Sequence, residues 1–217
     1  MNKPPMNRGF MSGAYLIRLG TESDADAASL LHSSRITEGF LPTLGPRFLR
    51  RLYRRIVRDQ GSFLIVAEQD GEIVAMVSCT ENIGALYRTF ILRDAAFAAV
   101  SALVPILRSL PRVLETLRYP SAESAVDPAN GASGPLPDAE VLAVAVSKDS
   151  SGKGLGRSLM VEAIAEFTRR GVTNVKVVAG SDNEAALALY RSTGFLDATA
   201  LEVHEGTHSL ALVWSSS

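Results

Sequence analysis

The chain has 217 residues, a formal net charge of −1 and a hydrophobic fraction of 47%. This composition is typical of a soluble globular protein with one sizeable core, and it excludes bulk attraction to nucleic acid or to a membrane surface. The single cysteine, Cys79, excludes an internal disulfide and fits a reducing cytoplasm. No apolar run reaches the roughly 20 residues of a membrane span, so we expect no transmembrane segment.

The first half of the chain alternates between strand patterns and helix patterns. Residues 1–12 hold two prolines and two methionines beyond the first, and they predict a disordered leader before a single domain over 13–217. Apolar periodicity and turn residues predict a strand at 15–19, a helix capped at Ser23, an amphipathic helix at 47–59, and strands at 62–68 and 72–80. The dipeptide Asp70-Gly71 predicts that the last two strands form an antiparallel hairpin.

Six arginines share the outer face of the amphipathic helix: Arg47, Arg50, Arg51, Arg54, Arg55 and Arg58. Such a face is usually solvated, and the alternative is a site for an anionic acceptor, membrane surface or partner.

The segment 83–138 is the most individual part of the chain. Residues 86–119 predict helices, and 120–138, rich in Pro, Gly, Ser and Ala, predict a flexible loop. We expect a helical insertion between the third and fourth strands. It either caps a substrate site or forms the interface of a homodimer.

The second half begins with a strand, a glycine-rich turn and a helix. The strand is expected at 140–146, the turn contains Gly152, Gly154 and Gly156, and the apolar stripe of the helix ends before Gly171. The remaining elements are a strand at 175–179, a helix opened by the capping box Ser181–Glu184 and ended before Gly194, and a hairpin of strands at 195–203 and 208–214.

The three glycines indicate an anion site. A glycine-rich turn before a helix leaves several N–H groups uncovered and directs them, with the positive end of the helix dipole, toward one point. Lys153 and Arg157 can add positive charge there. The spacing fits neither a P-loop nor a dinucleotide-binding fingerprint.

Two stretches, VLAVAVSKDSSGKGLGRSLM and NEAALALYRSTGF, resemble the signature segments of the GNAT superfamily of acyl-CoA-dependent N-acetyltransferases. The order of predicted elements over 14–214 is similar as well. The resemblance implies an α/β (α+β) fold of three layers, in which a central, mainly antiparallel mixed sheet splays at its fourth strand, near Val146, and carries helices on both faces.

The resemblance also implies acetyl-CoA as co-substrate, with its pyrophosphate held by the amides of the glycine turn. In the family pattern Q/R-x-x-G-x-G/A the first position is Ser151 here, so phosphate binding would depend more on backbone amides, Lys153 and Arg157. The backbone near Val144 and Val146 would accept the thioester arm. The implied cofactor-binding residues are Val144, Ala145, Val146, Gly152, Lys153, Gly154, Gly156, Arg157, Asn183 and Tyr190.

Tyr190 is the first catalytic candidate that the resemblance implies. It shares a helix face with Asn183 and Leu187, and its phenol would protonate the departing thiolate. The alternative is a core tyrosine whose hydroxyl is bonded locally.

Glu140 is the second candidate, since it matches a position where some family members carry the general base. Strict alternation along the strand places it on one face with Leu142, Val144 and Val146. An ordinary glutamate lies about six pKa units below a lysine-like ammonium. A base here therefore needs a raised pKa, a water relay or a less basic amine, and the alternative is a solvated glutamate at the strand end.

The function implied is transfer of an acetyl group from acetyl-CoA to a primary amine on a small molecule or peptide, by direct attack in a ternary complex. The alternative is a catalytically silent acyl-CoA-binding regulatory module. We expect no metal, because His204 and His208 lack the defined spacing of a ligand set.

Overall fold

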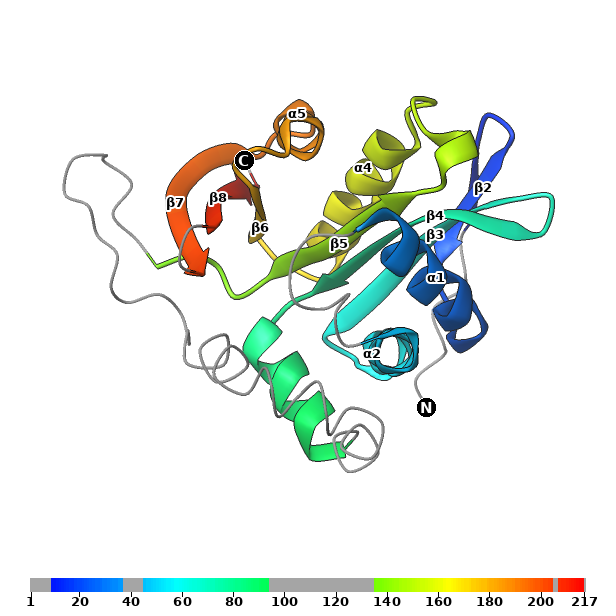
Figure 1. Cartoon of the computed structure of the whole chain (residues 1–217), viewed down its shortest axis with the longest axis horizontal. Helices are drawn as coiled ribbons and strands as arrows, with labels where there is room; N and C mark the ends of the chain where they lie inside the picture. Colours follow the sequence, from blue (N-terminus) through cyan, green and yellow to red (C-terminus); the bar gives the residue numbers. More distant parts are fainter. Residues whose placement is uncertain (1–8, 37–44, 94–134, 205–206, 217) are drawn as a thin grey trace.

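The structure is a computed structural model that describes residues 9–36, 45–93, 135–204 and 207–216 (Figure 1). The described strands form one eight-stranded sheet in the order β1-β2-β3-β4-β5-β6-β8-β7. These strands are β1 (Phe10–Ser12), β2 (Tyr15–Leu19), β3 (Ser62–Gln69), β4 (Glu72–Thr80), β5 (Glu140–Val146), β6 (Asn174–Gly180), β7 (Leu196–His204) and β8 (Thr207–Ser215). Neighbouring strands pair antiparallel, except β5 and β6, which pair parallel.

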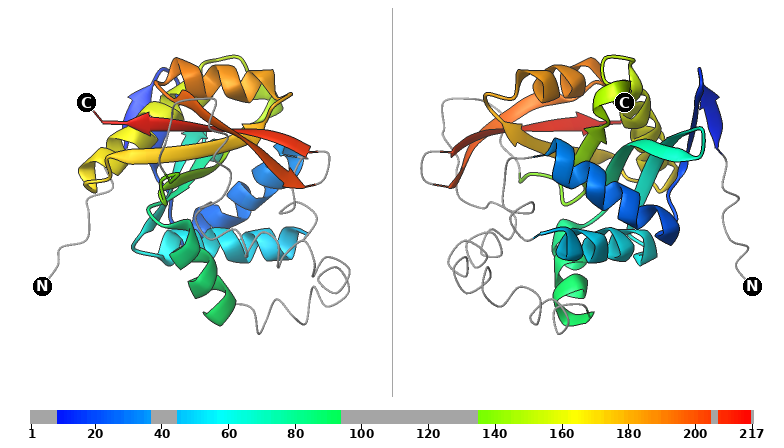
Figure 2. Two further views of the ribbon diagram at one scale, coloured as in Figure 1. Left: turned by 90° about the vertical axis from the view of Figure 1, so that its left-hand side faces the viewer. Right: turned by 45° about the vertical axis from the view of Figure 1, so that its right-hand side comes forward.

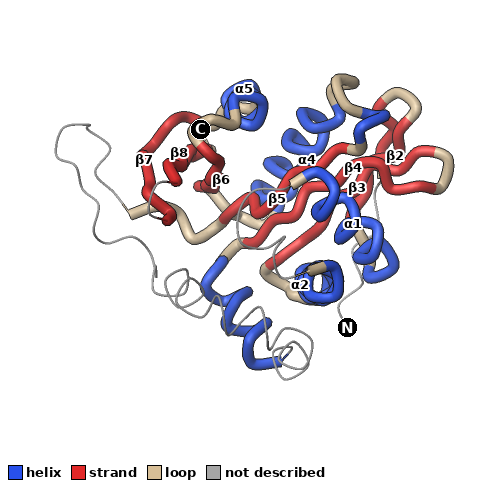
Figure 3. The backbone as a smooth tube through the Cα atoms, viewed as in Figure 1, coloured by secondary structure: helices blue, strands red, loops and turns tan. Residues whose placement is uncertain are grey.

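Helices cover both faces of this sheet (Figures 2 and 3). The labelled helices are α1 (Ala25–Arg35), α2 (Pro46–Arg58), α4 (Leu155–Arg169) and α5 (Glu184–Ser192). One core cluster joins the sheet to α4 and α5, and a second joins its other face to α1, α2 and a helix at 83–93. The predicted three-layer fold with a mainly antiparallel mixed sheet is therefore confirmed.

Several predicted elements appear where local chemistry dictates them. The β3–β4 hairpin turns at Asp70 and Gly71, whose φ angles of 53° and 83° are both left-handed. The amphipathic helix, the strand from Glu140, the helix after the glycine turn and the closing β7–β8 hairpin all form as expected. The expected insertion begins as the helix at 83–93, and its residues 94–134 lie outside the described part of the chain.

Two expectations at the N-terminal end were wrong. Phe10–Ser12, assigned to the disordered leader, pairs with β2 through a turn at Gly13, whose φ is 64°; residues 1–8 lie outside the described part. The first helical turn begins after Thr21 instead of Ser23. The reason is that Asp24 folds back to accept the Thr21 N–H at 2.7 Å, so that a single 3-10 turn, Glu22–Asp24, precedes α1.

The arginine face of α2 is partly neutralised by acids from the segment beside it. Arg50 and Arg54 both pair with Asp26, and Arg58 pairs with Glu22. These pairs attach α2 to the α1 region, and they favour the surface interpretation of this face over an anion site.

Arg18 is the most buried ionic anchor of the N-terminal region. Its guanidinium lies 2.7 Å from Asp24 and 2.9 Å from Glu68, and the side chain of Asp24 is 7% exposed. Burial acts to raise the pKa of Asp24, but the hydrogen bonds from Arg18 and Thr21 outweigh it and hold this pKa below its usual value. These three side chains therefore join β2, the first helical turn and β3.

The Arg18→Met variant is expected to lose about 3 kcal/mol of unfolding free energy, because Asp24 is left buried without its partner. The loss is expected to be full at neutral pH and to shrink as the pH falls below the ordinary aspartate pKa of about 4, where the carboxyl is protonated. Urea denaturation across this pH range measures it. The matched control is Arg191→Met, whose partner Asp197 is 48% exposed and whose loss should be much smaller, because water screens the pair. Equal losses in the two variants would contradict the account.

Candidate active site

The central parallel pair of strands separates early. β5 and β6 are paired only at Glu140–Lys176 and Val141–Val177, whereas β6 continues its pairing with β8 as far as Gly180. The sheet was expected to splay near Val146, and it opens five residues earlier. The edge of β5 beyond Val141 therefore has no neighbouring strand on the β6 side among the described residues.

A bulge at Leu142 reverses the alternation along β5. Ser78 of β4 pairs with Ala143 and Cys79 with Val141, so Leu142 has no partner on β4. Leu142 packs toward the α2 side of the sheet, whereas Val144 and Val146 pack toward the α4 side. Leu142 shares the α2-side face with Glu140 as expected, since both line one cavity. The expectation was wrong for Val144 and Val146, because a bulge inserts one extra residue into the two-residue repeat.

The glycine turn holds a row of unpaired backbone N–H groups. Ser151 donates to Lys148 and Ser158 donates to Gly154, but among the described residues no acceptor faces the six N–H groups of 152–157. Gly152 and Gly154 have φ angles of 75° and 78°, and a Cβ added at either would meet nothing within 4 Å. An open cradle of N–H groups at the start of a 15-residue helix suits an anion.

The other predicted residues of the turn have different surroundings. A Cβ on Gly156 would lie 3.3 Å from Leu189, so this glycine permits the close approach of α4 and α5. Arg157 reaches the carbonyl of Ser192 at 3.5 Å, and Lys153 is exposed beside the cradle.

Tyr190 lies in the core between α5 and the sheet. It is 7% exposed, and its ring centroid is 6.1 Å from that of Phe195. Within the described residues its hydroxyl makes no hydrogen bond, which disfavours the alternative of a locally bonded phenol. Burial raises the pKa of Tyr190 to about 12, with a smaller contribution from Cys79, so the phenol keeps its proton at neutral pH. Asn183 caps α5, and its side-chain oxygen accepts the Ala186 N–H at 3.1 Å.

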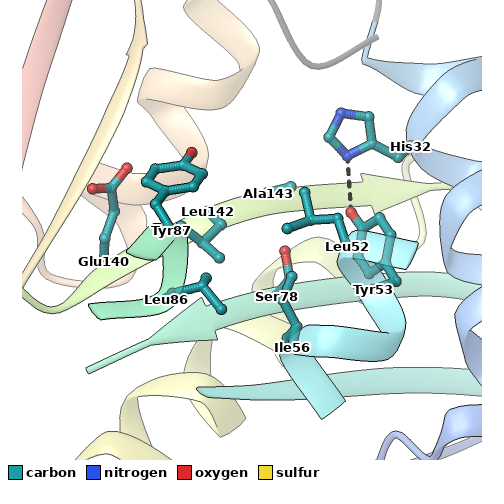
Figure 4. Close-up of a pocket in the computed structure, with 10 residues that line it drawn as sticks. All are labelled: His32, Leu52, Tyr53, Ile56, Ser78, Leu86, Tyr87, Glu140, Leu142 and Ala143. Atoms are coloured by element: carbon teal, nitrogen blue, oxygen red, sulfur yellow. Dashed lines mark hydrogen bonds between the residues drawn. The ribbon is translucent and has the colours of Figure 1, made fainter. Parts of the chain in front are cut away.

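A small cavity of about 50 Å³ lies on the α2 side of the bulge (Figure 4). Its lining residues are His32, Leu52, Tyr53, Ile56, Ser78, Leu86, Tyr87, Glu140, Leu142 and Ala143. The side chain of Glu140 is 15% exposed and lies 3.5 Å from Nζ of Lys176. Burial raises the pKa of Glu140 and Lys176 opposes this rise. Glu140 is therefore a largely buried, ion-paired carboxyl and not a fully solvated one.

Comparison with known proteins shows that part of the chain matches a protein family. Residues 123–195 match the model of the acetyltransferase (GNAT) family. The resemblance to the GNAT family is thereby confirmed.

Curated relatives match about a third of the chain. A [ribosomal protein bS18]-alanine N-acetyltransferase of Escherichia coli K12 is 41% identical over 64 residues, which are 30% of this chain and 43% of that protein. A mycothiol acetyltransferase of Kocuria rhizophila is 41% identical over 70 residues, which are 32% of this chain and 22% of that protein. The chain thus spans less than half the length of these GNAT relatives.

Solved structures of GNAT proteins share the fold over nearly the whole chain. The ribosomal-protein-S18-alanine N-acetyltransferase of Escherichia coli superposes with a TM-score of 0.58 at 16% identity, covering 93% of both chains. A putative acetyltransferase from Salmonella typhimurium, solved with its cofactor acetyl-CoA, superposes with a TM-score of 0.58 at 16% identity, covering 94% of both chains. At these identities the likeness concerns the GNAT fold alone.

Sequence reasoning missed four polar residues of the cavity: His32, Tyr53, Ser78 and Tyr87. They come from α1, α2, β4 and the helix at 83–93, so no local pattern links them. The available signal was a histidine placed among the apolar positions of the first helix.

The described residues lack two features. They contain no group of three or more His, Cys, Asp or Glu side chains that could hold a metal ion. No helix in this part of the chain combines the length and apolar character needed to cross a membrane.

Proposed function

We propose that this chain is an N-acetyltransferase that moves an acetyl group from acetyl-CoA to a primary amine. The observation that carries the proposal is the row of six unpaired N–H groups at 152–157, which stands beside the separated edges of β5 and β6. A pyrophosphate in this cradle would leave the thioester arm free to extend along the unpaired edge of β5. The match to the GNAT family model supports this assignment.

Besides the attack of the amine, the reaction needs stabilisation of the oxyanion, a proton for the thiolate and removal of a proton from the amine. The amine nitrogen attacks the thioester carbonyl while both substrates are bound, so that a C–N bond forms and the carbonyl oxygen becomes an oxyanion. The C–S bond breaks afterwards, when this tetrahedral intermediate collapses and releases the thiolate. Backbone N–H groups near Val144, next to the bulge, would hold the oxyanion of the tetrahedral intermediate. Tyr190 would give its proton to the departing thiolate, and the proton of the amine would leave through Glu140 or a water beside it.

The acceptor is proposed only as a class. The names of the relatives give an alanine of ribosomal protein bS18 in one case and mycothiol in the other, and the proposed class includes both a peptide and a small molecule that carries an amine. A homodimer and a cytoplasmic setting stay predictions.

The alternative is a silent acyl-CoA-binding regulatory module, and the ion pair between Glu140 and Lys176 favours it, since a paired carboxylate is a poorer base. Release of coenzyme A thiol across a panel of primary amines separates the two. An acetyltransferase is expected to release thiol in an amine-dependent way, whereas a regulatory module binds acetyl-CoA without turnover.

Replacing Lys176 by methionine is expected to move the acidic limb of the kcat/KM profile to higher pH. Glu140 must be ionised to accept a proton, and loss of the Lys176 charge raises its pKa further. The Glu140→Gln variant should lose this limb. Lys148→Met, which removes an exposed lysine charge from the short turn at Lys148–Ser150 after β5, is the control. An unchanged limb in both Lys176→Met and Glu140→Gln would remove Glu140 from the mechanism.

A further inference from the structure

A buried histidine on the wall of the cavity has a ring nitrogen without a partner. His32 is 3% exposed, and its Nε2 makes no hydrogen bond in the described part of the chain. Among the described residues, it is the only fully buried side-chain nitrogen or oxygen that has no hydrogen-bond partner. An unpaired buried polar group costs stability, so its presence in a cavity wall points to a ligand or water that completes it.

Tyr53 determines which ring nitrogen of His32 carries the proton. The Tyr53 hydroxyl lies 2.8 Å from Nδ1 of His32 and 3.6 Å from Sδ of Met76. We assign its single proton to the imidazole, because a thioether sulfur is a weak acceptor and the Ser78 hydroxyl, whose hydrogen bond lowers the pKa of Tyr53, acts as a donor to the Tyr53 oxygen. Burial lowers the pKa of His32, so the ring is neutral. Since Nδ1 accepts, the ring proton sits on Nε2, and His32 has an N–H donor without an acceptor.

The cavity has two polar ends. Figure 4 places Glu140 and Tyr87 at one end and His32 at the other. Glu140 and Ala143 are three residues apart on β5, which corresponds to about 10 Å, and the bulged residue Leu142 lies between them. An amine near the bulge would thus have the carboxyl on one side and the histidine on the other.

We propose that His32 is a specificity residue, which donates a hydrogen bond from Nε2 to a carbonyl oxygen of the acceptor, and that Tyr53 positions it. This inference rests on the proposed function. The favoured acceptor is a primary amine with a carbonyl a few bonds from the nitrogen and a small, unbranched link between them. A cavity of about 50 Å³ has room for only about four water-sized groups. A plain alkylamine would fill the same space and leave the N–H unpaired.

Matched amines test the proposal. Glycinamide and β-alaninamide are compared with n-propylamine and n-butylamine, which have similar length and no carbonyl. When kcat/KM is calculated on the concentration of unprotonated amine, the amides are expected to show a value at least about tenfold higher, because a site that donates a buried hydrogen bond rejects a ligand that lacks the acceptor. Equal kcat/KM for amides and alkylamines would overturn the proposal and assign the Nε2 proton to a water.

Two variants separate recognition from folding. His32→Phe should remove the preference for amides while the KM for acetyl-CoA stays unchanged. Tyr53→Phe should weaken this preference, because the hydroxyl that orients the ring of His32 is lost. The control is Ser29→Ala in the same helix, whose buried hydroxyl donates to the Asp26 carbonyl at 2.7 Å outside the cavity. A preference that survives in both His32→Phe and Tyr53→Phe would overturn the proposal.

Nitrogen NMR of the wild-type histidine ring gives a test that needs neither a variant nor turnover. The expected state is a neutral ring with its proton on Nε2, and glycinamide should shift the Nε2 signal more than n-propylamine does. A proton on Nδ1 would overturn the proposal, since Nε2 would then be an acceptor. Calorimetry with acetyl-CoA tests the proposed function separately: absence of cofactor binding refutes that function, while the ring signal still reports on the cavity.

Discussion

Replacing Tyr190 by phenylalanine is expected to lower turnover about 10²-fold while the affinity for coenzyme A stays unchanged. The ring that packs against Phe195 remains, so the core of α5 is preserved, and only the proton donor is lost. With its pKa raised to about 12 by burial, the phenol is fully protonated at neutral pH, so the rate should not fall at alkaline pH until well above pH 9. Steady-state kinetics and calorimetry measure the two quantities.

The control for this variant is Tyr15→Phe, which removes a phenol hydroxyl from the same core cluster on β2, away from the separated strands. It should leave turnover unchanged. If Tyr190→Phe turns over at the wild-type rate across the pH range, then Tyr190 is structural and water supplies the proton.

Replacing Gly154 by valine is expected to weaken coenzyme A binding at least tenfold, or about 1.4 kcal/mol. The added side chain would enter the open space in front of the N–H cradle, where a Cβ meets no protein atom within 4 Å. It would also strain a residue whose φ is 78°, so the variant needs a control that shares this strain.

Gly171→Val supplies that control. Gly171 follows the other end of α4, its φ is 79°, and a Cβ there also meets nothing within 4 Å. Both variants should lose similar stability in thermal melts, but only Gly154→Val should lose affinity in calorimetry. A folded Gly154→Val protein with wild-type affinity would show that the cradle is not the phosphate site.

Local signals in the sequence were sufficient for the glycine turn and its helix. Positive φ at Gly152 and Gly154 is a requirement that only glycine meets easily, and the apolar repeat of α4 follows directly in the chain. The strand from Glu140 and the Asp70-Gly71 hairpin were predictable for the same reason, since each depends on neighbouring residues.

The bulge and the cavity could not be predicted in this way. The register of β5 is set by β4, which lies some sixty residues earlier in the chain, and nothing within Glu140–Val146 marks Leu142 as the extra residue. The contact of His32 with Tyr53 depends on how α1 packs against α2. The ion pair of Glu140 likewise depends on Lys176, a residue from another strand.

The most direct test of acetyl transfer is a single turnover with enzyme in excess over acetyl-CoA that carries a carbon-13 label in its acetyl group, in the presence of a primary amine that supports thiol release. Mass spectrometry then locates the label. The account predicts that the label appears on the amine nitrogen in step with release of free coenzyme A, with none attached to the protein. Label that remains on bound coenzyme A with every amine, or that accumulates on the protein before it reaches the amine, would contradict it.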